Sequence, residues 1–409
     1  MSGSGPALQA PYPVTALVLQ GGGSLGSYQA GVYEALAESG VAPNWIAGIS
    51  IGALNAALIA GNPVERRVER LRAFWEHICQ PPLLPPTPFE QFGAEHWPNA
   101  WRAYASNVAA LRAVVEGQNG FFTPRSAAAL ALSPSDPAAA SLYDTTPMRA
   151  TLERFADFDR INDPRGVRVS IGTVNVHSGN FEYFDTARQV LGPEHFMASS
   201  ALPPGFPPVR VGSQYYWDGG LVSNTPLFYV ATAEPRVDAL IFQVDLWSAA
   251  GEAPRDLLQV ASRQKDIQFS SRTRMVTDYL AEQHAHRALL QELLALIPAS
   301  AGDNPWVRRA AALAATGRQN VFHLIYRNKH FDGYTKDFDF GLLSMRDHWA
   351  AGLDDMRRTL AHPEWFALPP AERPFTTHDI HRPAAGVPKH PASGPGPRQP
   401  APECPAEPG

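Results

Sequence analysis

A serine flanked by two glycines is the residue of this sequence whose type and setting best suit covalent chemistry. The segment Gly48-Ile49-Ser50-Ile51-Gly52 follows a short apolar run and precedes residues with helical spacing. The pattern G-x-S-x-G is typical of a nucleophile elbow, a strained strand-to-helix turn in which flanking glycines prevent clashes. The N-terminus of the following helix favours the negative charge that develops during acyl transfer. We therefore predict that Ser50 is a nucleophile and that Gly48 and Gly52 complete the elbow.

A glycine-rich segment precedes this serine. Residues 20–26 read Gln-Gly-Gly-Gly-Ser-Leu-Gly and follow another apolar run. Glycines let backbone N–H groups approach a ligand and a helix start attracts anions, so an anionic group is expected here. A phosphate-binding P-loop needs Lys after the last glycine, where this chain has Ser27. A dinucleotide site fits Gly21, Gly23 and Gly26, but the acidic residue expected about twenty positions later is missing. The third interpretation is an oxyanion hole of backbone amides, and the nearby serine favours it.

A nucleophilic serine needs a base, and the sequence offers one main candidate. An ordinary α/β-hydrolase would supply an acid and then a histidine after the serine. The chain has 13 His, and none lies in a context that singles it out. Asp218 is the better candidate, because it follows three aromatic residues and precedes Gly219 and Gly220. Asp-Gly is also a strong hairpin signal, so a plain β-turn stays an alternative at this position.

Two parallel strand–helix units are expected to position the serine and the glycine segment. Val14–Leu19 and Trp45–Ile49 are nearly continuous apolar runs, typical of strands buried on both faces. Helical spacing follows each run, over residues 25–37 and 53–59. Because neighbouring parallel strands end at the same edge of a sheet, the two loops should converge there. Further elements are expected as strands at 167–174, 237–244 and 321–326 and as helices at 263–297 and 340–360.

Composition narrows the function classes. Of the 409 residues, 44% are apolar and 18% are charged, as expected for a soluble chain with a large core. The formal charge of -5, from 34 Lys and Arg against 39 Asp and Glu, argues against a nucleic-acid partner. Cys79 and Cys404 are the only cysteines, which excludes a disulfide framework and a cysteine-built zinc site. No metal and no other cofactor is expected.

The sequence also bears on membranes. Residues 1–13 lack the basic start and apolar core of a secretory signal and are expected to form a flexible leader. Residues 39–64 carry no charge, but their prolines, asparagines and glycines favour a strand, a turn and a helix over a membrane span. The four basic residues near the start of the 263–297 helix suggest either a membrane-surface patch or a solvated face; they are Arg263, Lys265, Arg272 and Arg274. We expect a cytoplasmic enzyme. Peripheral contact with a membrane is a second expectation.

Two segments interrupt the pattern of strands and helices. Residues 81–125 are rich in proline and aromatics and are expected to form an insertion outside the sheet. Its aromatic residues either cover a pocket or form a satellite core; they are Phe89, Phe92, Trp97, Trp101, Phe121 and Phe122. Residues 382–409 are dominated by proline and glycine, which predicts a disordered tail. The catalytic domain is thus expected over 14–230, with the remainder of the sheet and a helical extension over 231–381.

Three of these segments, in this order, resemble the patatin-like phospholipases. Residues 21–26 are similar to the family's glycine-rich oxyanion loop, residues 48–56 to its nucleophile elbow, and Asp218-Gly219-Gly220 to its Asp-Gly-Gly/Ala block. Residues 198–209 also resemble the stretch upstream of the aspartate. The resemblance implies an α/β three-layer fold, in which helices flank a mainly parallel sheet, with a helical insertion. Segments 336–340 and 348–352 look like a helical C-terminal extension of a bacterial subgroup.

The resemblance implies an acyl hydrolase that acts on a lipid ester through a Ser–Asp dyad. Ser50 would be the nucleophile, Asp218 the base, and the backbone at Gly21, Gly22, Gly23 and Gly26 the oxyanion hole. Three alternatives remain. An acyltransferase usually has His before the serine, where this chain has Ile49. A polyester or short-chain ester hydrolase would use the same dyad. A non-catalytic nucleotide- or lipid-binding protein would use the glycine loop alone.

Overall fold

A computed structural model of the chain describes residues 12–80, 98–127, 136–270, 273–329 and 332–380. The expected tail at 382–409 and nearly all of the expected leader at 1–13 lie outside the described residues. The same holds for Phe89, Phe92, Trp97 and Arg272. Within the described part, no helix combines the length and the apolar character needed to cross a membrane.

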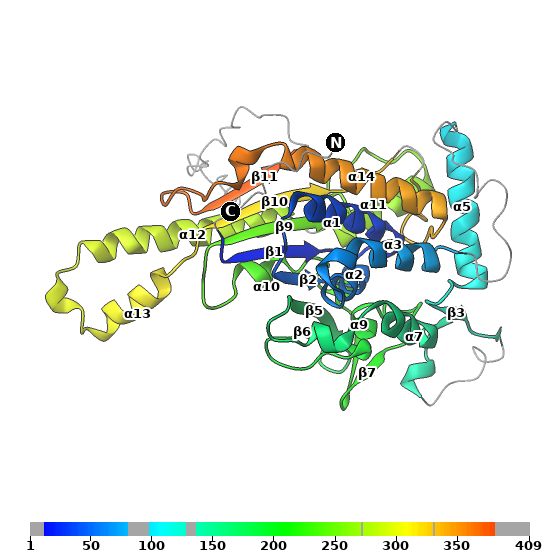
Figure 1. Ribbon diagram of the computed structural model, residues 1–409, viewed down its shortest axis with the longest axis horizontal. Coiled ribbons are helices and arrows are strands. Elements are labelled where there is room, and N and C mark those ends of the chain that lie inside the picture. The colour runs from blue at the N-terminus through cyan, green and yellow to red at the C-terminus, as the bar shows by residue number, and fades with distance from the viewer. Residues whose placement is uncertain (1–11, 81–97, 128–135, 271–272, 330–331, 381–409) are drawn as a thin grey trace, which may run out of the picture.

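A nine-stranded sheet forms the centre of the described chain (Figure 1). Six strands are parallel, in the order β11 (Phe375–Asp379), β10 (Gln319–Ile325), β9 (Ala239–Asp245), β1 (Val14–Leu19), β2 (Trp45–Gly48) and β5 (Arg168–Asn175). Three strands joined by antiparallel pairing complete it, namely β6 (Phe181–Asp185) and β8 (Gln214–Asp218) on β5, and β7 (Val209–Val211) on β8. The mainly parallel sheet that the family resemblance implied is therefore present.

Helices cover both faces of the sheet, which gives the expected three layers. One face carries α1 (Ser27–Ser39), α2 (Ile51–Ala60), α3 (Arg67–Ile78) and α14 (Leu342–Leu360), whose apolar side chains share a core with that face. The other face carries α10 (Leu227–Ala231) and α12 (Thr273–Ala295). The central strands are mostly apolar because both of their faces are buried, and every residue of β9 is buried. The predicted strands Val14–Leu19 and Trp45–Ile49 are confirmed to within one residue.

The expected 263–297 segment forms two helices, α11 (Leu257–Phe269) and α12. Its apolar positions are largely on the surface, since Met275, Tyr279 and Leu293 are each about half exposed or more. With α13 (Pro305–Ala314), α12 projects away from the sheet at one end of the molecule (Figure 1). Lys265 and Arg263 do not form a free basic patch, because Lys265 is paired with Asp337 and Arg263 donates to backbone carbonyls.

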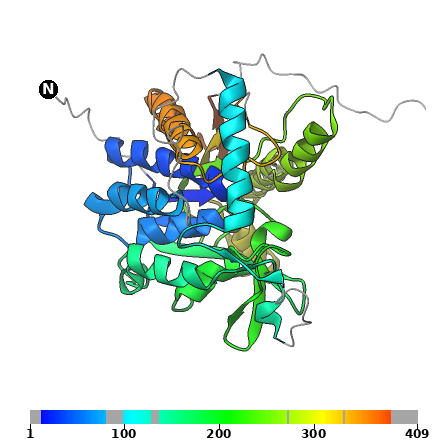
Figure 2. The same ribbon diagram turned by 90° about the vertical axis from the view of Figure 1, so that its right-hand side faces the viewer.

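The insertion contains a regular helix, α5 (Asn99–Glu116), which follows the undescribed residues 81–97. It stands at the end of the molecule opposite α12 and α13 and crosses in front of the helical layers in Figure 2. The helical insertion is thus confirmed over 99–116. Its position leaves one side of α5 against the protein and the other facing outward.

Candidate active site

Ser50 occupies the turn between β2 and α2 in a strained backbone conformation. Its φ is 54° and its ψ is -126°. Among the described residues, Ser50 alone combines a positive φ with a side chain. Such conformations persist at functional sites where surrounding contacts enforce them. The Ser50 N–H donates to Ser199 Oγ at 3.0 Å, and Ser199 in turn donates to the Gly172 carbonyl at 2.8 Å. These bonds hold the turn in place.

The glycines on either side of Ser50 are required by close packing. A Cβ at Gly48 would lie 2.4 Å from the carbonyl oxygen of Gly52, and a Cβ at Gly52 would lie 2.4 Å from that of Leu19. Neither position can therefore carry a side chain without moving the backbone. This strand–turn–helix geometry is the one that the G-x-S-x-G pattern predicts.

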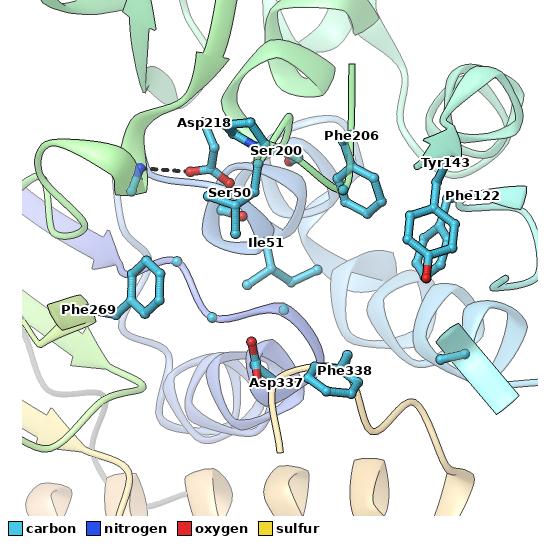
Figure 3. Close-up of a pocket in the computed structure, with 18 of the residues that line it drawn as sticks. Ser50, Ile51, Phe122, Tyr143, Ser200, Phe206, Asp218, Phe269, Asp337 and Phe338 are labelled. Atoms are coloured by element: carbon cyan, nitrogen blue, oxygen red, sulfur yellow. Dashed lines mark hydrogen bonds between the residues drawn. The ribbon is translucent and has the colours of Figure 1, made fainter. Parts of the chain in front are cut away.

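Asp218 lies at the end of β8 and is buried beside Ser50 (Figure 3). Its carboxylate faces the Ser50 side chain and accepts a hydrogen bond from the Gly220 N–H at 2.7 Å. Burial raises the pKa of Asp218 from its ordinary value to about 7, and the polar groups of Ser50 and Gly220 offset part of that rise. The structure thus brings together the two residues that the sequence analysis paired.

The pairing of β5 explains why these distant residues meet. β2 runs along one edge of β5 and stops where Gly48 pairs with Ile171. β8 takes over two residues later, where Asp218 pairs with Thr173. Both β2 and β8 lie opposite β6, so they share the same edge of β5. Asp218 therefore arrives directly beyond the carboxyl end of β2, where the chain turns at Ser50.

The four glycines of the loop have different surroundings. Gly21, Gly22 and Gly23 line a pocket together with Ser50 and Asp218, whereas Gly26 does not. The Gly21 N–H donates to the Asn224 carbonyl at 3.2 Å, so it is already occupied. Gly26 packs beneath the loop, where a Cβ would lie 2.5 Å from Ile51. The Gly21 N–H thus has an acceptor within the protein, and Gly26 lies outside the pocket lining.

Gly22 and Gly23 retain N–H groups that no described residue accepts. Gly23 has φ 56°, a conformation that favours glycine. The loop is anchored on both sides of this pair. Asn224 Nδ2 and Trp247 Nε1 both donate to the Gly21 carbonyl, at 3.0 and 2.9 Å, and Ser24 donates its N–H to the Asp337 carbonyl at 2.9 Å.

The pocket in front of Ser50 is large and mainly apolar. Its volume is about 470 Å³. Nine aromatic residues line it, namely Phe121, Phe122, Tyr143, Phe206, Trp247, Phe269, Tyr334, Phe338 and Phe340. Figure 3 labels five of them, Phe122, Tyr143, Phe206, Phe269 and Phe338. Phe121 and Phe122 come from the insertion and are buried, so they form part of the core and line the pocket at once. In the described chain no histidine lines this pocket, and no group of three or more metal-ligating side chains is found.

Two protein-family models match this chain. The family model Patatin-like phospholipase matches residues 17–231, more than half of the chain, and a second model, Patatin phospholipase, matches residues 267–372. The chain belongs to the patatin-like phospholipase family. Family membership supports a lipid-hydrolysing enzyme. No curated protein matches this chain.

Two solved structures are similar to this patatin-like phospholipase at low identity. VipD from Legionella pneumophila is 13% identical, with a TM-score of 0.32; the match covers 84% of this chain and 67% of VipD. Human GIVD cytosolic phospholipase A2 is 14% identical, with a TM-score of 0.29; the match covers 58% of this chain and 44% of the human protein. The chain thus spans less than half the length of the human enzyme.

Several residues around the site of this patatin-like phospholipase carry no signal in the local sequence. Asn224 and Trp247 anchor the glycine loop, and Asp337 and Phe338 reach the pocket from the C-terminal part of the chain. The segment 336–340 stands out in the sequence, but its place beside the glycine loop depends on contacts across more than 300 residues, such as the bond from Ser24 Oγ to the Lys336 carbonyl at 2.7 Å.

Proposed function

We propose that this protein hydrolyses carboxylic ester bonds of lipids through an acyl-enzyme intermediate on Ser50, with Asp218 as the base. The observation that carries the proposal is the placement of the Ser50 side chain beside the buried Asp218 carboxylate, whose pKa burial raises to about 7. A base works best when its pKa lies near the working pH, and an ordinary aspartate would be much too weak. The strained backbone at Ser50 supports the same role.

The proposed reaction has two halves. Ser50 Oγ attacks the ester carbonyl carbon while Asp218 takes its proton, and the carbonyl oxygen becomes an oxyanion. The N–H groups of Gly22 and Gly23 stabilise that oxyanion, since they are the loop donors without an acceptor in the described chain. Asp218 then protonates the leaving alcohol as the C–O bond breaks. Water attacks the acyl-enzyme, gives its proton to Asp218 and releases the acid, and the proton returns to Ser50.

The proposed substrate is an ester with an apolar acyl chain. The aromatic pocket of about 470 Å³ offers few polar partners besides the site itself. Burial of each CH₂ contributes about 0.8 kcal/mol, so a chain that fills the pocket binds more tightly than a short one. The lining therefore supports a fatty-acyl ester over a small polar one.

We also propose that the pocket rim contacts a lipid surface. Six large apolar side chains around the outer side of α5 and the pocket rim are 46–64% exposed; they are Trp101, Tyr104, Leu111, Val114, Val115 and Leu142. Val114 and Leu142 also line the pocket, so the exposed surface is continuous with the site. An exposed apolar surface beside a lipid-ester pocket is suited to shallow burial in a membrane interface.

The test is an activity panel with a Ser50→Ala control. Phospholipids, lysophospholipids, acylglycerols and p-nitrophenyl esters are each incubated with the wild-type chain, and released fatty acid is measured. Hydrolysis that depends on Ser50 supports the proposal. Equal release by Ser50→Ala, or no release from any ester together with no labelling of Ser50 by a fluorophosphonate, contradicts it. Transfer of the acyl group to an added alcohol in preference to water would replace hydrolysis with acyl transfer.

A further inference from the structure

Two adjacent residues of α11 form ion pairs with two adjacent residues of the C-terminal part of the chain. Lys265 pairs with Asp337, and Asp266 pairs with Lys336 through Nζ and Oδ1 at 2.5 Å. We call residues 334–340 the C-terminal strap. The Lys336 and Asp266 side chains are 2% and 8% exposed, so this second pair is almost completely removed from water.

The buried pair is part of a satisfied polar cluster. Lys336 Nζ also donates to Asn328 Oδ1 at 2.7 Å, and Asn328 Nδ2 donates to Asp266 Oδ2 at 3.3 Å. The Lys336 ammonium lies 4.9 Å from the centroid of the Trp247 ring. Removing one partner of such a pair leaves an uncompensated buried charge, whereas replacing both by apolar residues is often neutral for stability. The pair therefore fixes the place of the strap more than it adds stability.

The strap backbone holds the glycine loop. Ser24 donates its N–H to the Asp337 carbonyl at 2.9 Å and its hydroxyl to the Lys336 carbonyl at 2.7 Å. The approach is so close that a Cβ at Gly23 would lie 2.1 Å from the Asp337 carbonyl oxygen. Figure 3 shows Asp337 and Phe338 across the pocket from Ser50. The loop is thus fixed at Ser24 by the strap.

Trp247 contacts both the strap, which anchors the glycine loop at Ser24, and the anchor of the loop at Gly21. Its Nε1 donates to the Gly21 carbonyl at 2.9 Å, while its ring lies next to the Lys336 ammonium. Gly22 and Gly23, whose N–H groups have no acceptor in the described chain, lie between the anchors at Gly21 and Ser24. A shift of the strap would therefore move the two N–H groups relative to Ser50.

We propose that the C-terminal strap positions the oxyanion loop, with Lys336 and Asp337 as positioning residues. The C-terminal part of the chain then completes the active site instead of carrying a separate function. This inference rests on the proposed function, in which Gly22 and Gly23 stabilise the oxyanion. A misplacement of about 1 Å can cost about 10²-fold in rate, which is the scale expected for a released loop.

The test compares single and double substitutions of the buried pair. Lys336→Met removes the charge and keeps most of the side-chain volume, and it should lower kcat about 10- to 100-fold with KM nearly unchanged. The double variant Asp266→Leu/Lys336→Met removes the uncompensated charge, so its unfolding midpoint should return toward the wild-type value while kcat stays low. Recovery of kcat together with the midpoint would overturn the inference, because the pair would then act through stability alone.

A second readout reports on the oxyanion hole itself. A trifluoromethyl ketone with a fatty chain forms a tetrahedral oxyanion adduct on serine, and Lys336→Met should weaken its inhibition by the same factor as kcat falls. Binding of a non-hydrolysable ether lipid should stay the same. Ser24→Ala, which removes only one hydroxyl donor to the strap, should lower kcat in the same direction by a smaller factor.

The surface variant Lys329→Met serves as the matched control, because Lys329 is exposed and lies in the same part of the chain. It should retain wild-type kcat. If wild-type protein hydrolyses esters in a Ser50-dependent way and Lys336→Met and Ser24→Ala keep wild-type kcat, the strap inference fails alone. If wild-type protein shows no Ser50-dependent hydrolysis, the proposed function fails and the inference fails with it.

Discussion

Asp218 lies beside Ser50 because β8 occupies the edge of β5 that β2 leaves free. Burial, Ser50 and Gly220 perturb the pKa of the Asp218 carboxylate, and none of these three influences is a positive charge. Its pKa of about 7 is therefore set mainly by burial, and each protonation state has a consequence for activity and for stability.

The first prediction concerns the pH dependence of activity. The proposed base must be ionised, so kcat/KM for an uncharged ester should rise with pH and level off above an apparent pKa near 7. The measurement is kcat/KM for a p-nitrophenyl ester between about pH 5 and about pH 9, on the free enzyme. A rate that stays constant down to about pH 5 would contradict Asp218 as the base with a raised pKa.

The second prediction concerns stability at alkaline pH. Because the folded-state pKa of Asp218 is raised above its ordinary value, the folded state binds the proton more tightly, and stability falls as pH rises toward about 7. Asp218→Asn removes that effect and can keep the contacts with Ser50 and Gly220. We expect it to be inactive but more stable at about pH 8 by about 1 to 4 kcal/mol.

Thermal or denaturant unfolding of Asp218→Asn and wild type at about pH 8 and about pH 4 checks this prediction. The difference between the two proteins should shrink at the lower pH, where Asp218 is protonated in the folded state. A variant that is less stable than wild type at the higher pH would show that the carboxylate stabilises the fold, contrary to its burial.

The elements that depend on short-range patterns are the ones that the sequence predicts well. β1 is found at Val14–Leu19 as expected, because a buried parallel strand needs a continuous apolar run. The turn at Ser50 likewise depends on two flanking glycines. The α12 helix was expected, but its exposed apolar positions were not, since periodicity alone does not say which face is covered.

Contacts across the chain are what the sequence does not predict. Asp218 reaches Ser50 through the register of β8 on β5, and Asp-Gly alone is equally consistent with an ordinary turn. The hydrogen bond from the Gly21 N–H to the Asn224 carbonyl likewise joins residues about 200 positions apart, so no pattern near the glycines indicates it. The strap residue Lys336 meets Asp266 across 70 positions, and no local pattern encodes such a pair.

The third prediction concerns the acyl pocket. Leu202 lines it and is only partly buried, so a larger side chain there should extend into the cavity. Leu202→Trp should reduce kcat/KM for long-chain p-nitrophenyl esters by about fourfold for each CH₂ excluded, while the acetate ester is little affected. Leu202→Ala is the matched variant and should extend the preference toward longer chains. Equal effects of both substitutions on acetate and palmitate esters would contradict the pocket as the acyl site.

The fourth prediction concerns the lipid surface. Trp101, Tyr104 and Leu111 on α5 are exposed and do not line the pocket, so their replacement by serine should spare the chemistry. The triple variant should bind vesicles of phosphatidylcholine and phosphatidylglycerol at least about tenfold more weakly, because about 1.4 kcal/mol of lost burial suffices for that factor. Its kcat/KM on a dispersed short-chain ester should equal that of wild type.

The exposed apolar residues of α12 provide the control for that experiment. Leu289 and Leu293, with the adjacent Leu296, are 51–80% exposed. Their helix α12 lies at the end of the molecule opposite α5 (Figure 1). Their replacement by serine removes a similar apolar area without touching the pocket. Vesicle co-sedimentation should therefore fall only for the α5 variant. An equal loss for both variants would mean that binding follows total exposed apolar area, and the rim would lose its assigned role in presenting the pocket to lipid.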